Sequence, residues 1–367
     1  MTTHRRIAIN TGGGDAPGLN AVIHAIVYAA TGLGWEVFGV RDGYGGILSP
    51  ELYDKGIVKL DREGTRNITQ LGGTILGTTN HSDPFRQRSI GPDGAIIERD
   101  RSDEVIRRLK QEEIDALIVI GGDGSLSIGH GLGGKGLCVI GVPKTIDNDL
   151  EATVLTFGFD SAVAFATECI DRLHATAEAH QRILVVEVMG RYAGWIALNA
   201  GIAGRADAIL IPEVPYQISK VAAVLQRRMS GSRRYGIVVV AEGAKPIGGT
   251  VVTQSGSKTE YSERLGGVGE TVARQLQEAT GHETRSVVLG HLLRGGSPTA
   301  LDRLLGLSFG AAAVRGLAKG MQDVMVILDP PRISYAPLAK ALERLKTVPT
   351  GGSGVVTARA LEISLGD

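Results

Sequence analysis

The chain has 367 residues, enough for two domains of about 100 to 200 residues each. Its content of 43% hydrophobic and 21% charged residues is typical of folded globular proteins and excludes a largely disordered chain. Lys plus Arg and Asp plus Glu both number 39, so the chain lacks the net positive charge that general binding to nucleic acid or to anionic membranes needs. Any anion-binding site must therefore be local.

The sequence indicates a cytoplasmic protein. Its longest apolar runs, such as 116–120 and 237–241, are far shorter than the roughly 18 residues of a membrane-spanning helix. The segment Met1 to Gly14 has no apolar stretch of the kind found in secretory signals. Cys138 and Cys169 stand in apolar contexts that favour two small hydrophobic side chains over a disulfide, as expected in a reducing compartment.

Short β-rich runs recur along the chain, each followed by a glycine turn and then by a helix-like segment. They are residues 7–10, 36–40, 117–120, 137–142, 183–188, 208–211 and 235–241. This alternation predicts an α/β fold with a mostly parallel sheet that is covered by helices on both faces.

Three other segments complete the outline of the chain. Apolar residues recur at helical spacing between Glu151 and Ala179, which predicts a long helix with one face made of Phe165, Cys169, Ile170 and Leu173. Residues 243–267 are polar and rich in glycine without a clear period, so we expect a surface excursion. Residues 347–354 are expected to form a loop before a last apolar segment.

The first glycine turn, Thr-Gly-Gly-Gly-Asp-Ala-Pro-Gly-Leu-Asn at 11–20, follows the first β-rich run and precedes a helix. Successive glycines let backbone N–H groups approach an anion, and a helix N-terminus adds its dipole. The turn fits neither common fingerprint, because Pro17 replaces the third glycine of a dinucleotide site and Leu19-Asn20 replaces the Lys and Ser/Thr of a P-loop. A phosphate site and a purely structural turn both remain open.

The second turn, Gly-Gly-Asp-Gly-Ser at 121–125, places Asp123 at the carboxyl end of a strand, where ligands bind in open α/β sheets. Mg²⁺ is usually held by one or two carboxylates together with substrate phosphates. Asp123 is therefore a candidate for holding Mg²⁺ on a nucleotide, and the alternative is a carboxylate that caps the following helix.

The third motif, Pro-Lys-Thr-Ile-Asp-Asn-Asp at 143–149, again follows a β-rich run. In an extended segment Thr145, Asp147 and Asp149 lie on one side. Two close carboxylates can divide the work, one as the base for a hydroxyl and one near a metal. Lys144 can neutralise phosphate charge.

Further candidate site residues are scattered along the second half, and the Arg and His residues among them could bind a phosphate. They are Met189-Gly-Arg191, Glu242, Arg285 and the segment His-Leu-Leu-Arg at 291–294. Arg and His hold dianionic phosphates well, although each of these residues taken alone could be a solvated surface charge.

Together these motifs resemble the phosphofructokinase family, from Arg5 to about Leu345. The motif Glu-Val-Met-Gly-Arg at 187–191 and the run Gly-His-Leu-Leu-Arg-Gly-Gly-Ser-Pro at 290–298 add to the three turns, in the same order. The resemblance implies two Rossmann-like three-layer domains with the active site in the cleft between them. We expect a donor domain of 1–144 with part of about 278–315, and a sugar domain of 145–277 with about 316–367, between which the chain crosses more than once.

The resemblance implies that the enzyme converts fructose 6-phosphate to fructose 1,6-bisphosphate in glycolysis, with ATP and Mg²⁺. Asp147 would be the base that takes the proton of the 1-hydroxyl, and Thr145 and Arg191 would steady the transferring phosphoryl group. Asp123 would bind Mg²⁺, with support from Asp149.

The resemblance also implies the residues that hold the two substrates. Glu242 and the Met189-Gly190 pair would hold the sugar, and its 6-phosphate would be bound by Arg182, Arg285, His291 and Arg294. The residues matching Arg182 and Arg285 reach in from a neighbouring subunit in the family, which implies a homodimer or homotetramer. The donor pocket would be lined by Gly14, Tyr44, Asp123, Gly124 and Ser125.

Three departures from the well-known bacterial ATP enzymes stand out. Asn80-His81 replaces an Arg-Phe pair at the donor, so that contact is missing or comes from Arg86 or Arg88. His24 and Tyr28 replace arginines that bind effectors, which puts effector control in doubt. Ile128 replaces a glycine near the adenine, and the region 243–267 contains an insertion relative to those enzymes. In both features the chain resembles a branch of the family whose members use either ATP or pyrophosphate.

Gly124 and Lys144 bear on the choice of donor. In the family, typical ATP users have Gly at both positions, pyrophosphate users have Asp and Lys, and some ATP users have Gly and Lys. ATP is favoured here, and pyrophosphate is the alternative. A catalytically silent homologue would be expected to lack the base or the metal carboxylate, and this sequence keeps both.

Overall fold

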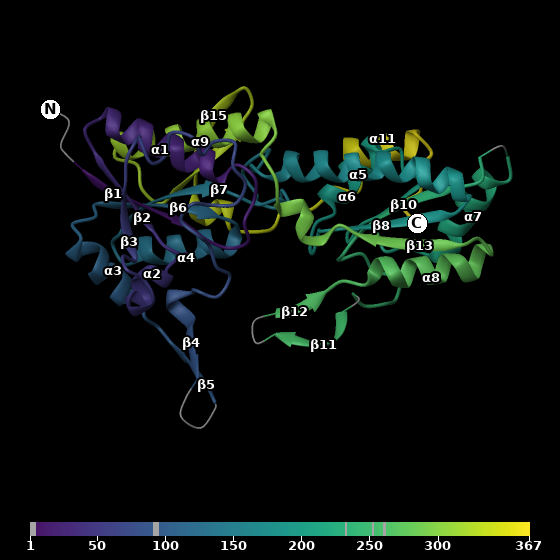
Figure 1. Cartoon of the computed structure of the whole chain (residues 1–367), viewed down its shortest axis with the longest axis horizontal. Helices are drawn as coiled ribbons and strands as arrows, with labels where there is room; N and C mark the ends of the chain where they lie inside the picture. The colour runs from purple at the N-terminus through teal and green to yellow at the C-terminus, as the bar shows by residue number, and fades with distance from the viewer. Residues whose placement is uncertain (1–4, 91–94, 232, 252, 260–261) are drawn as a thin grey trace. The chain divides into compact units, whose positions relative to one another are not determined.

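The computed structural model describes residues 5–90, 95–231, 233–251, 253–259 and 262–367. The chain divides into two compact units (Figure 1). Unit 1 comprises the chain up to Thr145, Leu150–Gly158 and Arg294–Arg344. Unit 2 comprises Ile146–Asp149, Phe159–Leu293 and Leu345–Asp367. Both units are α/β, so the expected fold class is confirmed.

Unit 1 is built on a seven-stranded sheet. Its strands, in spatial order, are β15 (Arg332–Pro337), β14 (Val324–Asp329), β7 (Cys138–Pro143), β6 (Ala116–Gly121), β1 (Arg6–Thr11), β2 (Glu36–Val40) and β3 (Ile57–Leu60). The inner strands β14, β7, β6, β1 and β2 are parallel, and the two edge strands are antiparallel to their neighbours. The carboxyl ends of β7, β6 and β1 therefore meet at one edge of the sheet.

Helices cover both faces of this sheet (Figure 1). One face carries α1 (Leu19–Gly32) and α9 (Ala300–Ala318), and the other carries α2 (Gly45–Leu48), α3 (Ser102–Gln111), α4 (Asp123–Gly134) and α10 (Leu338–Ala341). Ile7 and Ile9 pack on the α1 face and Ala8 on the other, as the alternation of a strand requires. Gly310 lets α9 approach α1, because a Cβ there would lie 2.5 Å from the carbonyl oxygen of Val22.

Short elements complete unit 1. The segments η1 (Pro50–Leu52) and η2 (Pro84–Arg86) are 3-10 turns, and β4 (Gln87–Ile90) pairs with β5 (Ile96–Arg99) in a hairpin.

Unit 2 is built on a four-stranded parallel sheet. Its order is β13 (Thr284–Val288), β8 (Ile183–Val188), β10 (Gly236–Ala241) and β9 (Ala208–Leu210). The helices α7 (Ile218–Met229) and α8 (Val268–Thr280) share a core with one face of the sheet, and α5 (Phe159–His180) and α6 (Trp195–Ala203) pack against β8, β9 and β10 and against each other. The last helix, α11 (Ser353–Ala360), packs on α6.

Each strand expected from the sequence is present, as β1, β2, β6, β7, β8, β9 and β10. The excursion at 243–267 contains a hairpin of β11 (Thr253–Thr259) and β12 (Ser262–Leu265), which its composition did not predict. Residues 252, 260 and 261 of that excursion lie outside the described residues.

The expected long helix is α5, but the prediction of its buried face was wrong. Phe165, Cys169 and Leu173 are only partly buried. The buried stripe is made largely of small residues and consists of Phe159, Ser161, Ala162, Ala166, Ile170, His174 and Ala177. Alanine side chains let the helix approach its neighbours closely. The size of the hydrophobic side chains in the sequence therefore does not show which face of the helix is buried.

The two units differ from the expected domains at Leu150–Gly158, which belongs to unit 1, and in the C-terminal half. Residues 316–344 belong to unit 1, because β14 pairs with β7 and β15 pairs with β14. Of the expected range 278–315, residues 294–315 belong to unit 1 as predicted in part, and 278–293 belong to unit 2, because β13 pairs with β8. Strand pairing across such sequence distances is not visible in local composition.

None of the helices in the described ranges is long and apolar enough to cross a membrane.

Cys138 and Cys169 are free thiols, and burial raises the pKa of both.

Asp207 forms a charged cluster that holds unit 2 together. Its carboxylate is 0% exposed and accepts hydrogen bonds from Arg228 Nη1 at 2.7 Å, from Arg233 Nη2 at 2.9 Å and from the backbone of Ile237 at 2.8 Å. Arg228 also donates to the Glu362 carbonyl at 2.7 Å. The cluster thus ties β9, α7 and the C-terminal segment to β10.

Asp207→Ala is expected to lower the free energy of unfolding by about 3 kcal/mol, because it leaves two guanidinium groups without their buried acceptor. Urea unfolding of the purified variant measures this. Glu278→Ala is the matched control, because it removes an exposed pair with Arg274 at 3.4 Å that contributes about 0.5 kcal/mol or less. Equal losses in the two variants would contradict the prediction.

Candidate active site

Three of the predicted motifs meet at the carboxyl edge of the unit 1 sheet. The turn after β1 begins at Gly12, the turn after β6 begins at Gly122, and Lys144 follows β7. Two backbone bonds join them, from Gly12 N to Ile120 O at 3.0 Å and from Lys144 N to Gly121 O at 2.9 Å. Neighbouring parallel strands produce this arrangement, which is where ligands bind in open α/β sheets.

The Ser125 side chain leaves no room for a side chain at two glycine positions of this edge. This side chain is 9% exposed and fills the space beside Gly12 and Gly121, so that a Cβ at Gly12 would lie 2.5 Å from the Ser125 hydroxyl. Gly13 has a φ of 76°, which favours glycine, and its carbonyl accepts a hydrogen bond from Thr78 Oγ1 at 2.6 Å. The first turn is therefore structurally constrained, whatever it binds.

Two cations lie on the first turn. The Lys144 side chain is 3% exposed and its ammonium donates to the Gly14 carbonyl. Arg294 Nη1 donates to the Asp15 carbonyl at 3.0 Å. A Cβ at Gly14 would lie 2.7 Å from Arg294 Nη1, so Gly14 leaves room for the guanidinium. The turn thus has the local positive charge that the neutral chain as a whole lacks.

The second turn leads directly into α4. Asp123 is the first residue of this helix and is exposed. A Cβ built on Gly124 meets nothing within 4 Å. An exposed carboxylate beside open space at a helix N-terminus fits an anionic ligand that brings its own Mg²⁺.

The third motif is divided between the units. Thr145 belongs to unit 1, and its carbonyl accepts a hydrogen bond from Thr156 Oγ1 at 2.7 Å. Asp147 and Asp149 belong to unit 2, on either side of Asn148. Asn148 has a φ of 49°, and its side-chain oxygen accepts a hydrogen bond from Lys346 Nζ at 2.9 Å.

The carboxyl edge of the unit 2 sheet carries the expected sugar-binding residues. Met189, Gly190 and Arg191 follow β8, and Glu242 follows β10, which pairs with β8. Gly190 has a φ of 143°, and its carbonyl accepts a hydrogen bond from Gly243 N at 3.1 Å. These contacts hold the ends of the two strands together.

His291 lies near this edge as well, in η3 (Gly290–Arg294). The preceding Leu289 donates its backbone N–H to Glu187 O at 2.9 Å, which holds the segment beside β8. His291 itself is exposed.

Arg182 and Arg285 lie at the opposite edge of the unit 2 sheet from Met189, Gly190, Arg191 and Glu242. Arg182 precedes β8 and Arg285 is the second residue of β13, so both are at the amino edge of the sheet. The six residues of β8 span about 20 Å. Both arginines face Glu283, with Arg182 at 3.6 Å and Arg285 at 3.0 Å.

Two residues near these motifs were not predicted from the sequence. The Glu213 carboxylate accepts backbone hydrogen bonds from Gly194 at 3.0 Å and from Val348 at 2.7 Å. Burial raises the pKa of Glu213, although these hydrogen bonds favour its ionised form. The other residue is Lys346, which contacts Asn148. Neither stands in a recognisable motif, because each acts on residues far away in the sequence.

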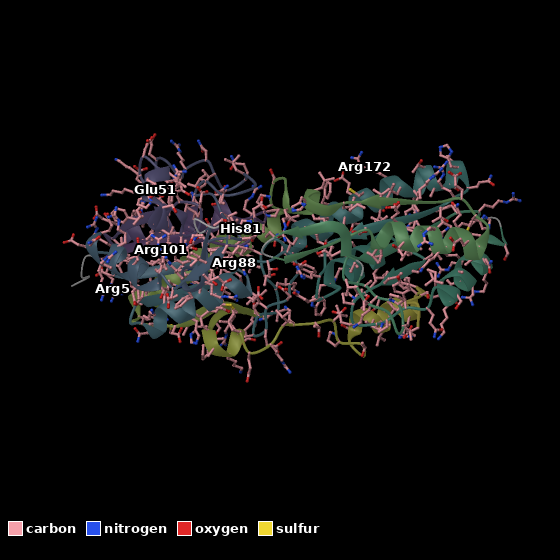
Figure 2. All side chains as sticks on the ribbon, turned by 90° about the horizontal axis from the view of Figure 1, so that it is seen from below. Arg5, Glu51, His81, Arg88, Arg101 and Arg172 are labelled. Atoms are coloured by element: carbon pink, nitrogen blue, oxygen red, sulfur yellow. The ribbon has the colours of Figure 1, made fainter. Side chains whose placement is uncertain are left out.

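Some side chains that were expected to contact the donor are buried or paired with other residues. The Tyr44 side chain is 2% exposed, and burial raises the pKa of its hydroxyl. Arg88, labelled in Figure 2, pairs with Glu98 at 2.7 Å, and Arg86 pairs with the same carboxylate at 3.2 Å. Their hydrogen bonds, that of Arg88 first, lower the pKa of Glu98.

The residues that replace effector-binding arginines form a packed cluster. The rings of His24 and Tyr28 stack with centroids 4.1 Å apart, and the Arg62 guanidinium lies 5.1 Å from the centre of the Tyr28 ring. His24 Nδ1 lies 2.7 Å from the Thr65 carbonyl. The loop after β3 therefore contacts this part of α1.

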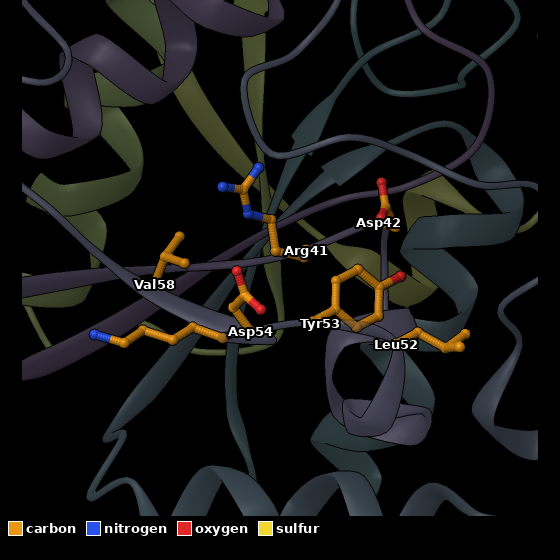
Figure 3. Close-up of a pocket in the computed structure, with 7 residues that line it drawn as sticks. Arg41, Asp42, Leu52, Tyr53, Asp54 and Val58 are labelled. Atoms are coloured by element: carbon orange, nitrogen blue, oxygen red, sulfur yellow. The ribbon is translucent and has the colours of Figure 1, made fainter.

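A pocket of about 450 Å³ opens near the carboxyl end of β2 (Figure 3). Its lining residues are Arg41, Asp42, Leu52, Tyr53, Asp54, Lys55 and Val58. Burial and a hydrogen bond to Asp42 raise the pKa of Tyr53. The pocket has two cations and two carboxylates, and none of the predicted site residues lines it.

The sequence model of the phosphofructokinase family matches residues 6–317. The chain belongs to the phosphofructokinase family. It is 47% identical to a protein of Chloroflexus aurantiacus named ATP-dependent 6-phosphofructokinase, over 99% of this chain and 98% of that one. It is 45% identical to ATP-dependent 6-phosphofructokinase 2 of Clostridium perfringens over the whole of both chains.

Solved phosphofructokinase structures share the fold. The phosphofructokinase of Saccharomyces cerevisiae matches with a TM-score of 0.77 and 32% sequence identity. The match covers 92% of this chain and 45% of the yeast chain, so this chain spans less than half the length of the yeast one. Membership of the phosphofructokinase family, expected from the motifs, is confirmed.

Proposed function

We propose that this chain is a Mg²⁺-dependent 6-phosphofructokinase. It transfers the γ-phosphoryl group of ATP to the 1-hydroxyl of fructose 6-phosphate, as a step of glycolysis in the cytoplasm. The observation that carries the proposal is the similarity over nearly the full length to relatives named ATP-dependent 6-phosphofructokinase. Two free thiols fit the reducing cytoplasm.

The base in this proposal is Asp147. Its carboxylate accepts the proton of the 1-hydroxyl as the oxygen of that hydroxyl attacks the γ-phosphorus of ATP. The bond between the γ-phosphorus and the oxygen that bridges it to the β-phosphorus breaks in the same step. Thr145 and Arg191 steady the phosphoryl group, and the Lys144 ammonium offsets the charge near it. The contact of Lys144 with the Gly14 carbonyl supports this, since it keeps the ammonium beside the first turn.

Asp123 would hold Mg²⁺, supported by Asp149. Mg²⁺ held there would neutralise part of the negative charge of the phosphates. The exposed position of Asp123 at the start of α4 fits this role, since a carboxylate there can reach an ion carried by the nucleotide. Gly14, Tyr44, Gly124 and Ser125 would complete the donor site.

The sugar would be held by Glu242, Met189 and Gly190, at the carboxyl edge of the unit 2 sheet. Its 6-phosphate would be bound by His291 and Arg294, together with Arg182 and Arg285 of a neighbouring subunit. Guanidinium groups make charge-assisted hydrogen bonds that suit a phosphate dianion.

A coupled aldolase assay with each donor tests the function. We expect fructose 1,6-bisphosphate to form with Mg²⁺ and ATP, and not after chelation of Mg²⁺. Pyrophosphate belongs in the same assay, because Lys144 is the residue found in pyrophosphate users. An enzyme that accepts pyrophosphate and ignores ATP would overturn the assignment of the donor, and inactivity with both donors would overturn the function.

Gly14→Ala is expected to raise the KM for fructose 6-phosphate by about tenfold, although Gly14 belongs to the donor turn. Its φ is not positive, so alanine fits the backbone, but the methyl group would displace Arg294. The loss of one hydrogen bond to a charged group has about this effect. Steady-state kinetics of Gly14→Ala, alone and combined with Arg294→Gln, provide the measurement. If Arg294→Gln raised the KM for fructose 6-phosphate as much in the Gly14→Ala variant as in the wild type, the proposed link between Gly14 and Arg294 would be contradicted.

We further propose that the active form is a homo-oligomer with shared sites. The separation of Arg182 from Met189 along β8 supports this, because one chain cannot easily bring both to one sugar phosphate. Mixing inactive Asp147→Asn subunits with inactive Arg182→Ala subunits is expected to restore activity, since some hybrid sites carry neither substitution. Mixed oligomers that stay inactive would count against sharing.

A further inference from the structure

The segment around Lys346, near the C-terminus, lies against the catalytic motif within unit 2. Lys346 Nζ donates to Asn148 Oδ1 at 2.9 Å, and the backbone N–H of Lys346 donates to the Asp149 carbonyl at 2.8 Å. Asn148 stands between Asp147 and Asp149. One lysine therefore contacts the two residues that follow the proposed base.

We propose that Lys346 is a positioning residue that fixes the backbone of the proposed base, Asp147. The neighbouring Asn148 has a φ of 49°. A left-handed conformation is uncommon for a residue other than glycine, and although asparagine tolerates it best, it persists where the surroundings hold it. The ammonium contact on the Asn148 side chain, together with the backbone contact on Asp149, provides such support. The inference rests on the proposed role of Asp147.

Lys346 is itself held in place by contacts with Trp195. The indole N–H of Trp195 donates to the Lys346 carbonyl at 2.9 Å, and the Lys346 ammonium lies 5.9 Å from the centre of the Trp195 ring. Two residues later, the backbone of Val348 donates to Glu213 at 2.7 Å. The backbone of Lys346 is therefore held in place. Its side-chain hydrogen bond to Asn148 can then fix the position of the motif that contains the proposed base.

Glu213 extends the same support to the sugar-binding residues. It also accepts the backbone N–H of Gly194, which precedes α6 and follows Arg191 by three residues. The segment 346–348 therefore joins the motif of the base to the loop that carries Arg191. A general base must lie within hydrogen-bond reach of its proton, and a misplacement of about 1 Å can cost as much as 100-fold in rate.

The test compares Lys346→Met with Lys346→Arg. Methionine keeps the unbranched stem and the backbone donor but removes the ammonium. We expect Lys346→Met to lower kcat by about 10- to 100-fold, with the KM values for ATP and fructose 6-phosphate within about twofold of the wild type. Lys346→Arg restores a donor and is expected to recover most of kcat. A kcat of Lys346→Met equal to that of the wild type, or an equal loss in Lys346→Arg, overturns the proposal.

Arg344→Met is the matched control. It removes a positive charge two residues earlier, where Arg344 makes an exposed ion pair with Glu151 at 3.0 Å. Its kcat is expected to equal that of the wild type. A similar fall of kcat in Arg344→Met would assign the effect to loss of charge in general and overturn the proposal.

A second variant guards against misfolding of Lys346→Met. Asn148→Gly removes the other end of the same bond, and glycine adopts the observed φ without strain. The double variant is expected to lose hardly more kcat than either single one, because all three lack the same bond. Additive losses overturn the proposal. Full activity of Asp147→Asn would instead show that the assignment of the base, and not the role of Lys346, had failed.

Discussion

Asp147→Asn is expected to lower kcat by about 10² to 10⁴-fold, the range found when a general base is removed. The amide has nearly the shape of the carboxylate but cannot accept the proton of the 1-hydroxyl. The KM for fructose 6-phosphate is expected to change little, because the lost interaction develops only as the proton moves. Single-turnover measurements with saturating ATP would separate the chemical step from product release.

The same measurement on Asp171→Asn provides the control. Asp171 is an exposed residue of α5 without a proposed role, so its kcat is expected to match that of the wild type. If Asp147→Asn kept the turnover of this control, the base would have to be another group. The circular-dichroism spectrum and the unfolding midpoint of each variant establish that the fold is intact.

Gly124→Asp is expected to abolish the use of ATP. The resemblance to the family implies that this position lies against the α-phosphate of ATP, where a carboxylate would occupy its space and repel its charge. The structure predicts little loss of stability, because a Cβ at Gly124 meets nothing within 4 Å. An acidic residue in the first turn of a helix is also favourable, by about 0.3 to 1 kcal/mol.

The comparison needs kcat/KM for ATP and for pyrophosphate in the wild type and in Gly124→Asp. Gly134→Asp is the matched control, since it makes the same substitution at the other end of α4, where a Cβ also meets nothing within 4 Å. We expect it to keep ATP activity. Activity of Gly124→Asp with pyrophosphate would indicate that Lys144 supports the smaller donor. Undiminished ATP activity of Gly124→Asp would refute the proposed place of the α-phosphate.

The strands and the motifs at their ends could be predicted because both are local in sequence. Apolar runs such as 116–120 identify inner strands, and a parallel sheet brings their carboxyl ends to one edge. Asp123 and Lys144 could therefore be assigned to this edge from the sequence. The lack of room for a side chain at Gly12 could not be predicted, because it depends on Ser125, which is distant in the sequence.

The remaining features depend on contacts between distant residues. Lys346 reaches Asn148 across nearly 200 positions, and Arg294 reaches the Asp15 carbonyl from a still more distant one. No spacing rule predicts such pairs. The buried face of α5 could not be predicted either, because it depends on how closely Ala162 and Ala166 let that helix pack.

The pairing of β7 with β14 has a consequence during protein synthesis. β7 ends at Pro143 and β14 begins at Val324, so about 180 residues must be translated before the edge of β7 is covered. At about 5 to 20 residues per second this takes roughly 10 to 40 s. For that time the nascent chain carries the unpaired edge of an apolar strand, which is a template for aggregation. Production of this protein should therefore depend on chaperones that bind nascent chains, and on slower growth at lower temperature, more than the stability of the finished fold would suggest.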